Sequence, residues 1–560
     1  MKFKGFLFTL LAVMLLSATA HPESVSAERA DVYVYVDGEE LDADPGAYSE
    51  NGRTMVPMRV VFEALHAQVQ WDTSTKTVSG KTADKTVSLQ LNSKTATVNG
   101  NPVALDVPAQ QVDGRIMVPL RFVSESLGYP VYFNDKGGYY GDQAQVNIFT
   151  NPQVSLKYRD FDHRPDTDDY GYSYHFTPAV RYLYTDGSRI HILHADQPGG
   201  SRPRGLSPDG PVGVTIYHFD TQLNPLGKTD ITGELPVFGG FHQSEDGFYY
   251  IAYGEHNLQE VGNQVVYSIV KYDAEWNKVG QADIRDVHTA IPYDGSNVTM
   301  DSRDGMLVVH SARTRYTSDD GKRHQSNITF QIRTSDMAVL DSGGQWPKNH
   351  VSHSFATYVR FDGSRIVYAD HGDAYPRSIV LQTEDNGGMT NERDIITFPG
   401  EIGENHTGAM LGGLEVSDTH YLLVGSSIVP KLSYVAGYSA NLFVAALPKN
   451  GVGQADVKLN WLTDLKGASS TGLNPTVDES HLVRLSDGRY AVIWSQIGDD
   501  ARTTTYYAIV DGTGATVKAP AKLGGVPAPG NIAPLVLGDQ LIWYGTDGSK
   551  TAFYTIDLSE

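Results

Sequence analysis

One short pattern recurs seven times between Asn151 and Glu560 and limits what this part of the chain can fold into. Each copy has an alternating apolar run, a tight turn of aspartate and glycine, and a second apolar run, which together are a strong signal for a β-hairpin. The turns begin at Asp186, Asp246, Asp304, Asp362, Asp418, Asp487 and Gly538, with Thr419 replacing one glycine and the last pair inverted. They recur at intervals of 60, 58, 58, 56, 69 and 51 residues, an average of about 59.

This constant period predicts the arrangement of the strands. Further apolar runs follow the hairpins, so each unit has about four strands, which is typical of a β-propeller blade. The last unit stops after its third strand, Ala552 to Ile556, and we expect Val154 to Tyr158 to supply the fourth and close the ring. A series of β-sandwich domains is the alternative, but it would not require a constant period.

A different repeat lies upstream, where Gly52 to Leu65 has a near copy at Gly114 to Leu127. Both copies contain Met-Val-Pro-x-Arg, and apolar residues at helical spacing follow each proline. Strands are expected before the copies at Val32 to Val36 and Thr97 to Leu105, and shortly after them.

On these motifs, residues 32–149 resemble the copper amine oxidase-like N-terminal domain, or stalk domain, of secreted proteins from Gram-positive bacteria. The resemblance implies a small duplicated α+β domain that acts as a spacer or wall-associated module. It does not imply copper or amine oxidase activity, because the segment has one histidine, His66, and the chain has no Asn-Tyr-Asp or Asn-Tyr-Glu sequence for a topaquinone. The predicted fold is mainly β: this domain over 32–149 and a seven-bladed β-propeller over 151–560.

Residues 1–27 have the pattern of a signal peptide. Lys2 and Lys4 precede the apolar run Phe6 to Leu16, and small residues offer cleavage after Ala20 or Ala27. An uncleaved anchor is the alternative. No later stretch reaches about 18 apolar residues, so no integral membrane span is expected after cleavage. We expect a secreted, extracellular protein, with or without association with the cell wall.

Composition excludes several classes of function. Lys and Arg number 44 against 66 Asp and Glu, a formal charge of −22, which argues against nucleic acid as a partner. The chain has no cysteine, which excludes disulfides, thiol catalysis and cysteine-ligated zinc. Its 56 glycines, 32 tyrosines and low charged fraction of 20% are typical of a β-rich extracellular protein.

Polar residues gather in the loops before the first strand and after the second strand of each unit, which open on the same face of a propeller. Histidine there serves as a base and arginine as a clamp for carboxylate or sulfate. The catalytic candidates are His353, His371, Arg313, Arg315 and Arg377. The candidates for ligand binding are His175, His288, His350, His406, Asp370, Asp373, Tyr375 and Arg502. The histidines stand at different distances from their turns, so polar loop tips with structural histidines are the alternative.

No metal or other cofactor is assigned with certainty. Five aspartates between Asp160 and Asp169 are compatible with calcium but lack the EF-hand spacing, and a solvated acidic linker is the alternative.

Three functions remain open. The first is a non-enzymatic module that binds a polysaccharide or another cell-envelope component, since tyrosine-rich loops suit sugar stacking. The second is a propeller enzyme of lyase, hydrolase or sulfuryl-transfer type on a carbohydrate or sulfated substrate. The third is a scaffold for protein partners. The chain contains no G-x-S-x-G, P-loop or H-E-x-x-H motif, which favours the first.

Overall fold

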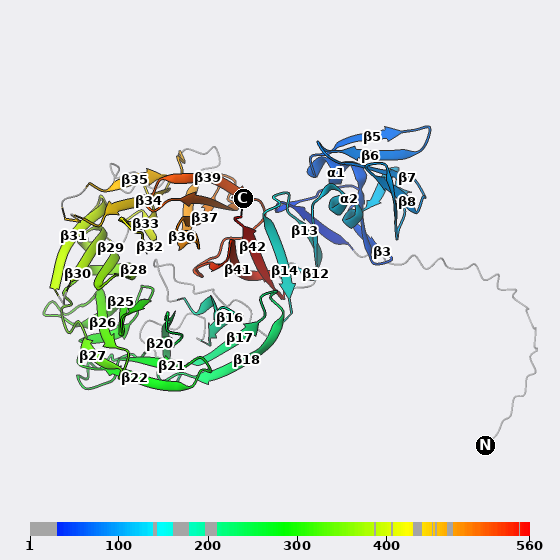
Figure 1. Cartoon of the computed structure of the whole chain (residues 1–560). Helices are drawn as coiled ribbons and strands as arrows, with labels where there is room; N and C mark the ends of the chain where they lie inside the picture. The colour runs from blue at the N-terminus through cyan, green and yellow to red at the C-terminus, as the bar shows by residue number, and fades with distance from the viewer. Residues whose placement is uncertain are drawn as a thin grey trace, which may run out of the picture.

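The computed structural model describes residues 31–137, 143–160, 179–196, 210–385, 388–404, 407–428, 439–450, 452–453, 456–466, 474–547 and 549–559. These residues are mainly β, with two short helices, and form a small N-terminal domain beside a ring of sheets (Figure 1). The predicted fold class is confirmed. The predicted signal peptide lies outside the described residues. No helix in the described part of the chain is long and apolar enough to cross a membrane.

The N-terminal domain has three sheets and two helices. The first sheet contains β12 (Val131–Gly137), β13 (Gln143–Ile148), β1 (Val32–Val36) and β2 (Glu39–Glu40). The second contains β10 (Gln110–Val112), β11 (Arg115–Pro119), β4 (Arg53–Pro57) and β3 (Tyr48–Glu50). The third contains β5 (Gln68–Asp72), β6 (Thr77–Lys81), β7 (Thr86–Gln90), β8 (Thr95–Val98) and β9 (Asn101–Ala104). The helices are α1 (Met58–Ala64) and α2 (Leu120–Leu127).

The two copies of the duplicated motif pair with each other. Strands β4 and β11 are antiparallel neighbours, with Val56 opposite Val118 at the centre of the ladder. Each strand ends at its proline, and a helix begins at the next residue, as the sequence predicts. Gly128 ends α2 in the left-handed conformation, at φ 100°, which only glycine adopts without strain. The duplication therefore forms one symmetric core.

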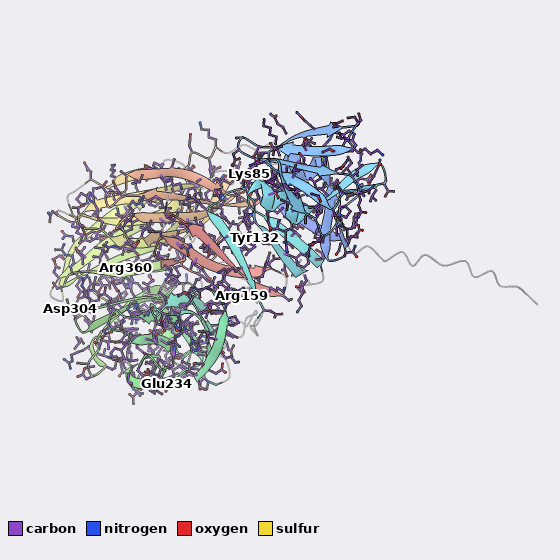
Figure 2. All side chains as sticks on the ribbon, turned by 45° about the vertical axis from the view of Figure 1, so that its right-hand side comes forward. Lys85, Tyr132, Arg159, Glu234, Asp304 and Arg360 are labelled. Carbon is purple, nitrogen blue, oxygen red and sulfur yellow. The ribbon has the colours of Figure 1, made fainter. Side chains whose placement is uncertain are left out.

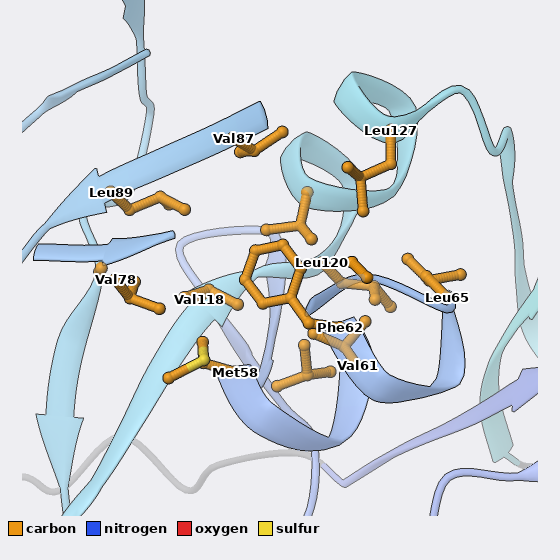
Figure 3. Close-up of a cluster of buried hydrophobic side chains, with 14 of the residues drawn as sticks. Met58, Val61, Phe62, Leu65, Val78, Val87, Leu89, Val118, Leu120 and Leu127 are labelled. Atoms are coloured by element: carbon orange, nitrogen blue, oxygen red, sulfur yellow. The ribbon is translucent and has the colours of Figure 1, made fainter. Parts of the chain in front are cut away.

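Helix α1 and the third sheet meet around Phe62, which is fully buried (Figure 3). Its ring lies over Gly80, where an added Cβ would stand 2.1 Å from a ring carbon. A side chain at this position would therefore displace the ring. Burial of such an aromatic or aliphatic side chain contributes about 1.5–3 kcal/mol, so Phe62 and its neighbours hold the domain together.

One predicted strand was wrong. The run Thr97 to Leu105 is not a single strand but part of the hairpin β8–β9, with Asn99 and Gly100 at the turn. Both residues have positive φ, 51° and 82°, which is the requirement of a two-residue turn in a tight hairpin. The Asn-Gly pair therefore decides the local structure, and the residues on either side of it form two strands rather than one.

The ring contains seven four-stranded antiparallel units, which we call blades 1 to 7, and blades 3 and 4 belong to one nine-stranded sheet. Blades 1 and 2 contain β15 (Arg181–Thr185), β16 (Ile190–Ala195), β17 (Gly213–Phe219), β18 (Pro225–Thr232), β19 (Val237–Gln243), β20 (Tyr249–Gly254), β21 (Tyr267–Tyr272) and β22 (Lys278–Ile284). Blade 3 contains β24 (Thr299–Arg303), β25 (Met306–Thr317), β26 (Arg323–Arg333) and β27 (Ala338–Asp341), with β23 (Thr289–Pro292) added to the end of β25. Blade 4 contains β28 (Ser352–Asp362), β29 (Arg365–Tyr375), β30 (Ser378–Asp385) and β31 (Gly388–Thr397).

The remaining blades complete the circle. Blades 5 and 6 contain β32 (Ala409–Val416), β33 (His420–Ser427), β34 (Asn441–Pro448), β35 (Lys458–Trp461), β36 (Thr476–Arg484), β37 (Tyr490–Ile497), β38 (Thr503–Val510) and β39 (Thr516–Leu523). Blade 7 contains β40 (Leu535–Leu537), β41 (Gln540–Asp547), β42 (Lys550–Asp557) and β14 (Val154–Arg159). Because β14 pairs with β42, the start of the propeller closes on its end, as the sequence predicts. Ring closure leaves no blade with an open face.

Neighbouring blades pack through apolar clusters, with one exception. Most contacts between blades bury a large group of aliphatic and aromatic side chains. Between blades 3 and 4 the described apolar cluster is small, with Val308, Val359, Phe361, Ile366 and Tyr368. Buried polar side chains fill the rest of that contact. We call this contact the blade 3–4 interface.

The N-terminal domain contacts blades 6 and 7. Tyr132, labelled in Figure 2 where the two parts meet, packs against the apolar cluster between these blades. The amide of Asn134 donates to the carbonyl of Asp547 at 2.9 Å, and Lys550 pairs with Asp135. On the other side, the Asp37 carboxylate accepts a hydrogen bond from the Thr150 amide at 2.8 Å. The junction is therefore a contact of many groups rather than a single linker.

Candidate functional site

The blade 3–4 interface lies where the longest strands of the propeller meet. Strands β25, β26, β28 and β29 have 12, 11, 11 and 11 residues, longer than the other described propeller strands. Ser326 pairs with Ser352, which joins the two blades into one continuous sheet on the side where the predicted site loops open.

A buried histidine–aspartate pair connects the two blades. Nε2 of His310 lies 3.0 Å from Oδ2 of Asp370, and Ser354 donates to the other carboxylate oxygen at 2.8 Å. Nδ1 of His310 lies 2.8 Å from the Thr329 hydroxyl. His310 and Asp370 are fully buried, so Asp370, a predicted ligand-binding residue, stands behind the surface in a structural network.

A second pair is accessible. Nδ1 of His353 lies 3.0 Å from Oδ1 of the buried Asp373, and the His353 side chain is 25% exposed. The backbone of His353 is left-handed at φ 53°, which is unusual for a residue other than glycine and is concentrated at functional sites. The ring of His324 lies 6.4 Å from that of His353 and has its own partner, Asp320, at 2.9 Å.

Arg377 supports this second pair from behind. One terminal nitrogen donates to the carbonyl of Asp373 at 3.0 Å, and the other donates to the carbonyl of Pro399 at 3.0 Å. The same guanidinium lies 3.6 Å from the Glu404 carboxylate. Arg377 therefore holds the loop around Asp373 and is itself largely buried.

His371 is also internal. Its Nε2 lies 2.8 Å from the Thr407 hydroxyl, and its ring contacts Phe355 and Phe398 edge-on, at 5.5 and 5.1 Å. Since the side chain is fully buried among these groups, it does not reach a ligand on the surface without a rearrangement.

Two arginines of β25 form the third element of the interface. Arg313 is fully buried and donates to the carbonyls of Val287 and Gln345. Burial lowers its pKa to about 10. Arg315 stands two residues along the same strand, and its Cζ lies 3.6 Å from the centre of the Trp346 ring. His350 contacts the same indole edge-on at 4.9 Å.

Trp346 was not among the residues predicted from the sequence. It lies between β27 and β28, two residues after the pair Gly343 and Gly344, which both have positive φ. Its side chain is 58% exposed, the largest exposure of any described tryptophan. A tryptophan in a Ser-Gly-Gly-Gln loop on the binding face was the signal that could have identified it.

The other predicted residues are dispersed. Tyr375 is 71% exposed and lies opposite Ser352 in the β28–β29 ladder, so it belongs to the same surface. His288 packs against Tyr316 at 5.3 Å beside β23. Arg502 pairs with Glu39 of the N-terminal domain and lies outside the interface. His175 and His406 lie outside the described residues.

An acidic pair lies in the innermost strand of blade 6. The β36–β37 ladder shifts register between Val477 and Ser480, so Asp478 and Glu479 occupy a β-bulge. Burial, and then the charge of Asp478, raises the pKa of Glu479 to about 7. The sequence analysis did not identify this pair.

Metal ligands are not gathered in the described residues. No group of three or more His, Cys, Asp or Glu side chains there is placed to hold a metal ion. The acidic stretch considered for calcium lies almost entirely outside the described residues. Its first member, Asp160, is described and lies 3.6 Å from Lys136.

Three solved structures that resemble this chain are distant from it in sequence. Hydrazine synthase of Kuenenia stuttgartiensis is 12% identical, with 61% of this chain and 81% of that chain covered and a TM-score of 0.34. A protein of unknown function from Dyadobacter fermentans is 12% identical, with 64% and 99% covered and a TM-score of 0.35. The hemagglutinin-neuraminidase ectodomain of parainfluenza virus 5 is 8% identical, with 72% and 85% covered and a TM-score of 0.31. We draw no conclusion from TM-scores this low.

Sequence comparison is informative for the N-terminal domain. No curated protein matches the chain. Residues 35–139 match the family model of the copper amine oxidase N-terminal domain, which confirms the resemblance inferred from the duplicated Met-Val-Pro-x-Arg motif for this part of the chain.

Proposed function

We propose that this is a secreted bacterial protein whose propeller binds an extracellular polysaccharide or another sugar-containing envelope component. The binding surface is the exposed edge of the blade 3–4 interface, around Trp346, Tyr375 and His353. The N-terminal domain acts as a spacer or wall-associated module, and residues 1–27 direct export.

The exposed ring of Trp346 is the observation that carries this proposal. Large aromatic side chains usually bury most of their surface, because each contributes strongly to packing. Trp346 leaves 58% of its side chain in solvent while Arg315 and His350 hold the ring in place. A fixed, exposed indole face suits the apolar C–H face of a sugar ring, since little conformational entropy is lost on binding.

Tyr375 adds a second aromatic surface. It lies opposite Ser352, two residues from His350, which contacts the Trp346 ring. Between these elements, His353 offers a partly exposed imidazole that Asp373 orients. Aromatic faces with a few oriented polar groups are the usual composition of a small-molecule or sugar site.

The test is retention of the purified protein on immobilised polysaccharides, both neutral and acidic. We expect Trp346→Ala to weaken retention at least about tenfold, which is ~1.4 kcal/mol, because a central tryptophan usually contributes more than this at a binding surface. Trp71→Ala is the matched control, since Trp71 is 40% exposed on β5 of the N-terminal domain. Retention on no polymer, or equal loss in both variants, would contradict the proposal and favour a protein partner.

A second candidate function is catalysis on the same polymer. The His353–Asp373 pair favours it, because a buried carboxylate that orients a partly exposed imidazole is the arrangement of a general base. A lyase would produce an unsaturated sugar that absorbs ultraviolet light, and a hydrolase would produce new reducing ends. Measurement of both products in the retention assay separates an enzyme from a binding module.

A further inference from the structure

Arg315 is almost completely buried but has no anionic partner. Its side chain is 7% exposed. Among the residues that the structure describes, no carboxylate lies within ion-pair distance of its guanidinium and no acceptor receives a hydrogen bond from it. Its Nε is buried without a partner. The Trp346 ring, 3.6 Å from Cζ, is the contact that remains.

Arg313 places a second uncompensated charge beside it. The two arginines stand two residues apart on β25, so their side chains leave the strand on the same face. The terminal nitrogens of Arg313 donate only to neutral groups, the carbonyls of Val287 and Gln345 and the Thr289 hydroxyl. Its Nε is also buried without a partner, and no described carboxylate pairs with it.

His350 completes the cluster. Its Nδ1 is buried without a hydrogen-bond partner in the described structure, and its ring contacts Trp346. Burial, followed by the charges of Arg315 and Arg313, lowers its pKa to about 4. The imidazole is therefore neutral at pH 7 and is able to donate one hydrogen bond from Nδ1.

Two partly buried arginines of the propeller, each about 30% exposed, differ from these two. Arg360, labelled in Figure 2, pairs with Glu415 at 3.0 Å, and Arg365 pairs with Asp385 at 2.9 Å. A buried charge without a partner is costly, and proteins usually supply one. The cluster of Arg313, Arg315 and His350 is therefore built for a negative charge that the described chain does not provide.

We propose that Arg315, with Nδ1 of His350 and the Trp346 ring, receives an oxyanion carried by the bound polysaccharide. This inference rests on the proposed function and narrows it to an acidic polymer, either a uronic acid or a sulfate ester. The guanidinium fork matches both groups, because each presents two oxygens in one plane. The net charge of −22 repels polyanions at long range, so recognition depends on this local cluster rather than on general attraction.

Matched polymer pairs test the inference on the full chain. We would compare polygalacturonate with its carboxyl-reduced form, and a sulfated galactan with its desulfated form. We expect one acidic member to bind about tenfold to a hundredfold more tightly than its neutral counterpart, the range expected for a charge-assisted hydrogen bond. Arg315→Met should remove the difference, and Arg315→Lys should restore part of it. The polymer pair that shows the difference in affinity identifies the oxyanion as a carboxylate or a sulfate.

Small anions provide a readout that is independent of polymer binding. We expect sodium sulfate or sodium glucuronate, against sodium chloride at equal ionic strength, to raise the unfolding temperature of the wild type more than that of Arg315→Met, in which only the nonspecific effect of the salt remains. One outcome contradicts this inference alone: polymers bind through Trp346 without preference for acidic forms, and neither anion stabilises the wild type more than Arg315→Met. The proposed oxyanion site is then wrong, while the proposed function stands. If an anion binds at Arg315 but no polymer is retained, the proposed function is wrong and the oxyanion site serves a free anion. An equal increase in the wild type and Arg315→Met shows an adventitious ion only and overturns the proposed oxyanion site.

Stability without a ligand supplies the final control. Because Arg315 has no anionic or hydrogen-bonding partner among the described residues, and Met keeps an apolar contact with the Trp346 ring, Arg315→Met should unfold at the same temperature as the wild type or a higher one. Arg360→Met, which leaves Glu415 unpaired, should unfold at a lower temperature. An equal decrease in both variants would mean that Arg315 has an internal partner, and would overturn the inference.

Discussion

The guanidinium of Arg315 lies over the indole ring of Trp346, with 3.6 Å between Cζ and the ring centre. This contact joins a buried charge to the most exposed tryptophan that the structure describes. The guanidinium covers one face of the indole, so a sugar ring that stacks on Trp346 uses the other face. The relationship links the two proposals, because stacking and charge recognition would act at one position.

The emission of Trp346 should report on ligand binding. The chain has six tryptophans, so the signal is the difference between the wild type and Trp346→Phe. A sugar that stacks on the ring removes water from it, and we expect the difference spectrum to shift to shorter wavelength as polysaccharide is added. Trp461→Phe, on the outer strand of blade 5, should leave the shift unchanged. A shift that survives in Trp346→Phe would place the ligand elsewhere.

Removal of the His353 imidazole should distinguish binding from catalysis. For a binding module, we expect no polymer shortening by the wild type and a loss of affinity below about threefold in His353→Ala, because this side chain is 25% exposed and offers less contact surface than Trp346. His324→Ala is the control, since its ring lies beside His353 but pairs with Asp320. Shortening by the wild type that is lost in both His353→Ala and Asp373→Asn would establish the enzyme instead, since loss of a general base costs about 10²–10⁴ in rate.

Closure of the ring should depend on the buried face of β14. Leu156 is buried in the cluster between blades 6 and 7, whereas its neighbour Ser155 is exposed on the same strand. We expect Leu156→Ala to lower the free energy of unfolding by about 2–5 kcal/mol, because it leaves a cavity beside β42. Ser155→Ala should change it by less than about 0.5 kcal/mol. Chemical denaturation of both variants measures the difference, and equal values would mean that β14 does not stabilise the ring.

Glu479 should make the protein less stable at alkaline pH. Its pKa in the folded protein is raised to about 7 from 4.5, so the folded state binds the proton more tightly than the unfolded state. This contribution to stability is complete below about pH 4.5 and is lost as the pH rises through 7. Between pH 5 and pH 8, the free energy of unfolding of Glu479→Gln should rise by about 1–2 kcal/mol relative to that of the wild type. This value allows for partial exposure of the group.

Thermal or chemical unfolding across this pH range measures the effect. Burial lowers the pKa values of His191, His242 and His350 to about 4, so these groups are neutral above about pH 6.5 and their contribution is lost only at acid pH. Because these titrations fall partly between the two pH values compared, the test uses the difference between Glu479→Gln and the wild type, in which the histidine contributions cancel. Glu245→Gln, at an exposed position in the turn between β19 and β20, is the control. If the free energy of unfolding changes equally in the wild type and Glu479→Gln between pH 5 and pH 8, another group causes the pH dependence.

The sequence by itself determined the architecture, because the signals for it are local. Asp-Gly turns such as Asp186-Gly187 specify hairpins through the φ values that they permit, and their constant period specifies repeated blades. The incomplete last unit specified that Val154 to Tyr158 returns to the end of the chain. In the N-terminal domain, proline followed by helical spacing located both helices, although a turn at Asn99 divided one expected strand.

Only the tertiary structure decided which polar residues meet. His310 and Asp370 are 60 residues apart in the sequence, and each is an ordinary strand residue until ring closure brings the two blades into contact. In the folded ring, His371 and Arg313 are buried and Trp346 is exposed. Arg502 lies at the junction with the N-terminal domain, where it pairs with Glu39. A turn depends on a few adjacent residues, whereas burial and pairing depend on every blade that packs around a side chain. For this reason the fold was predictable from the pattern, and the grouping of Arg313, Arg315, His350 and Trp346 was not.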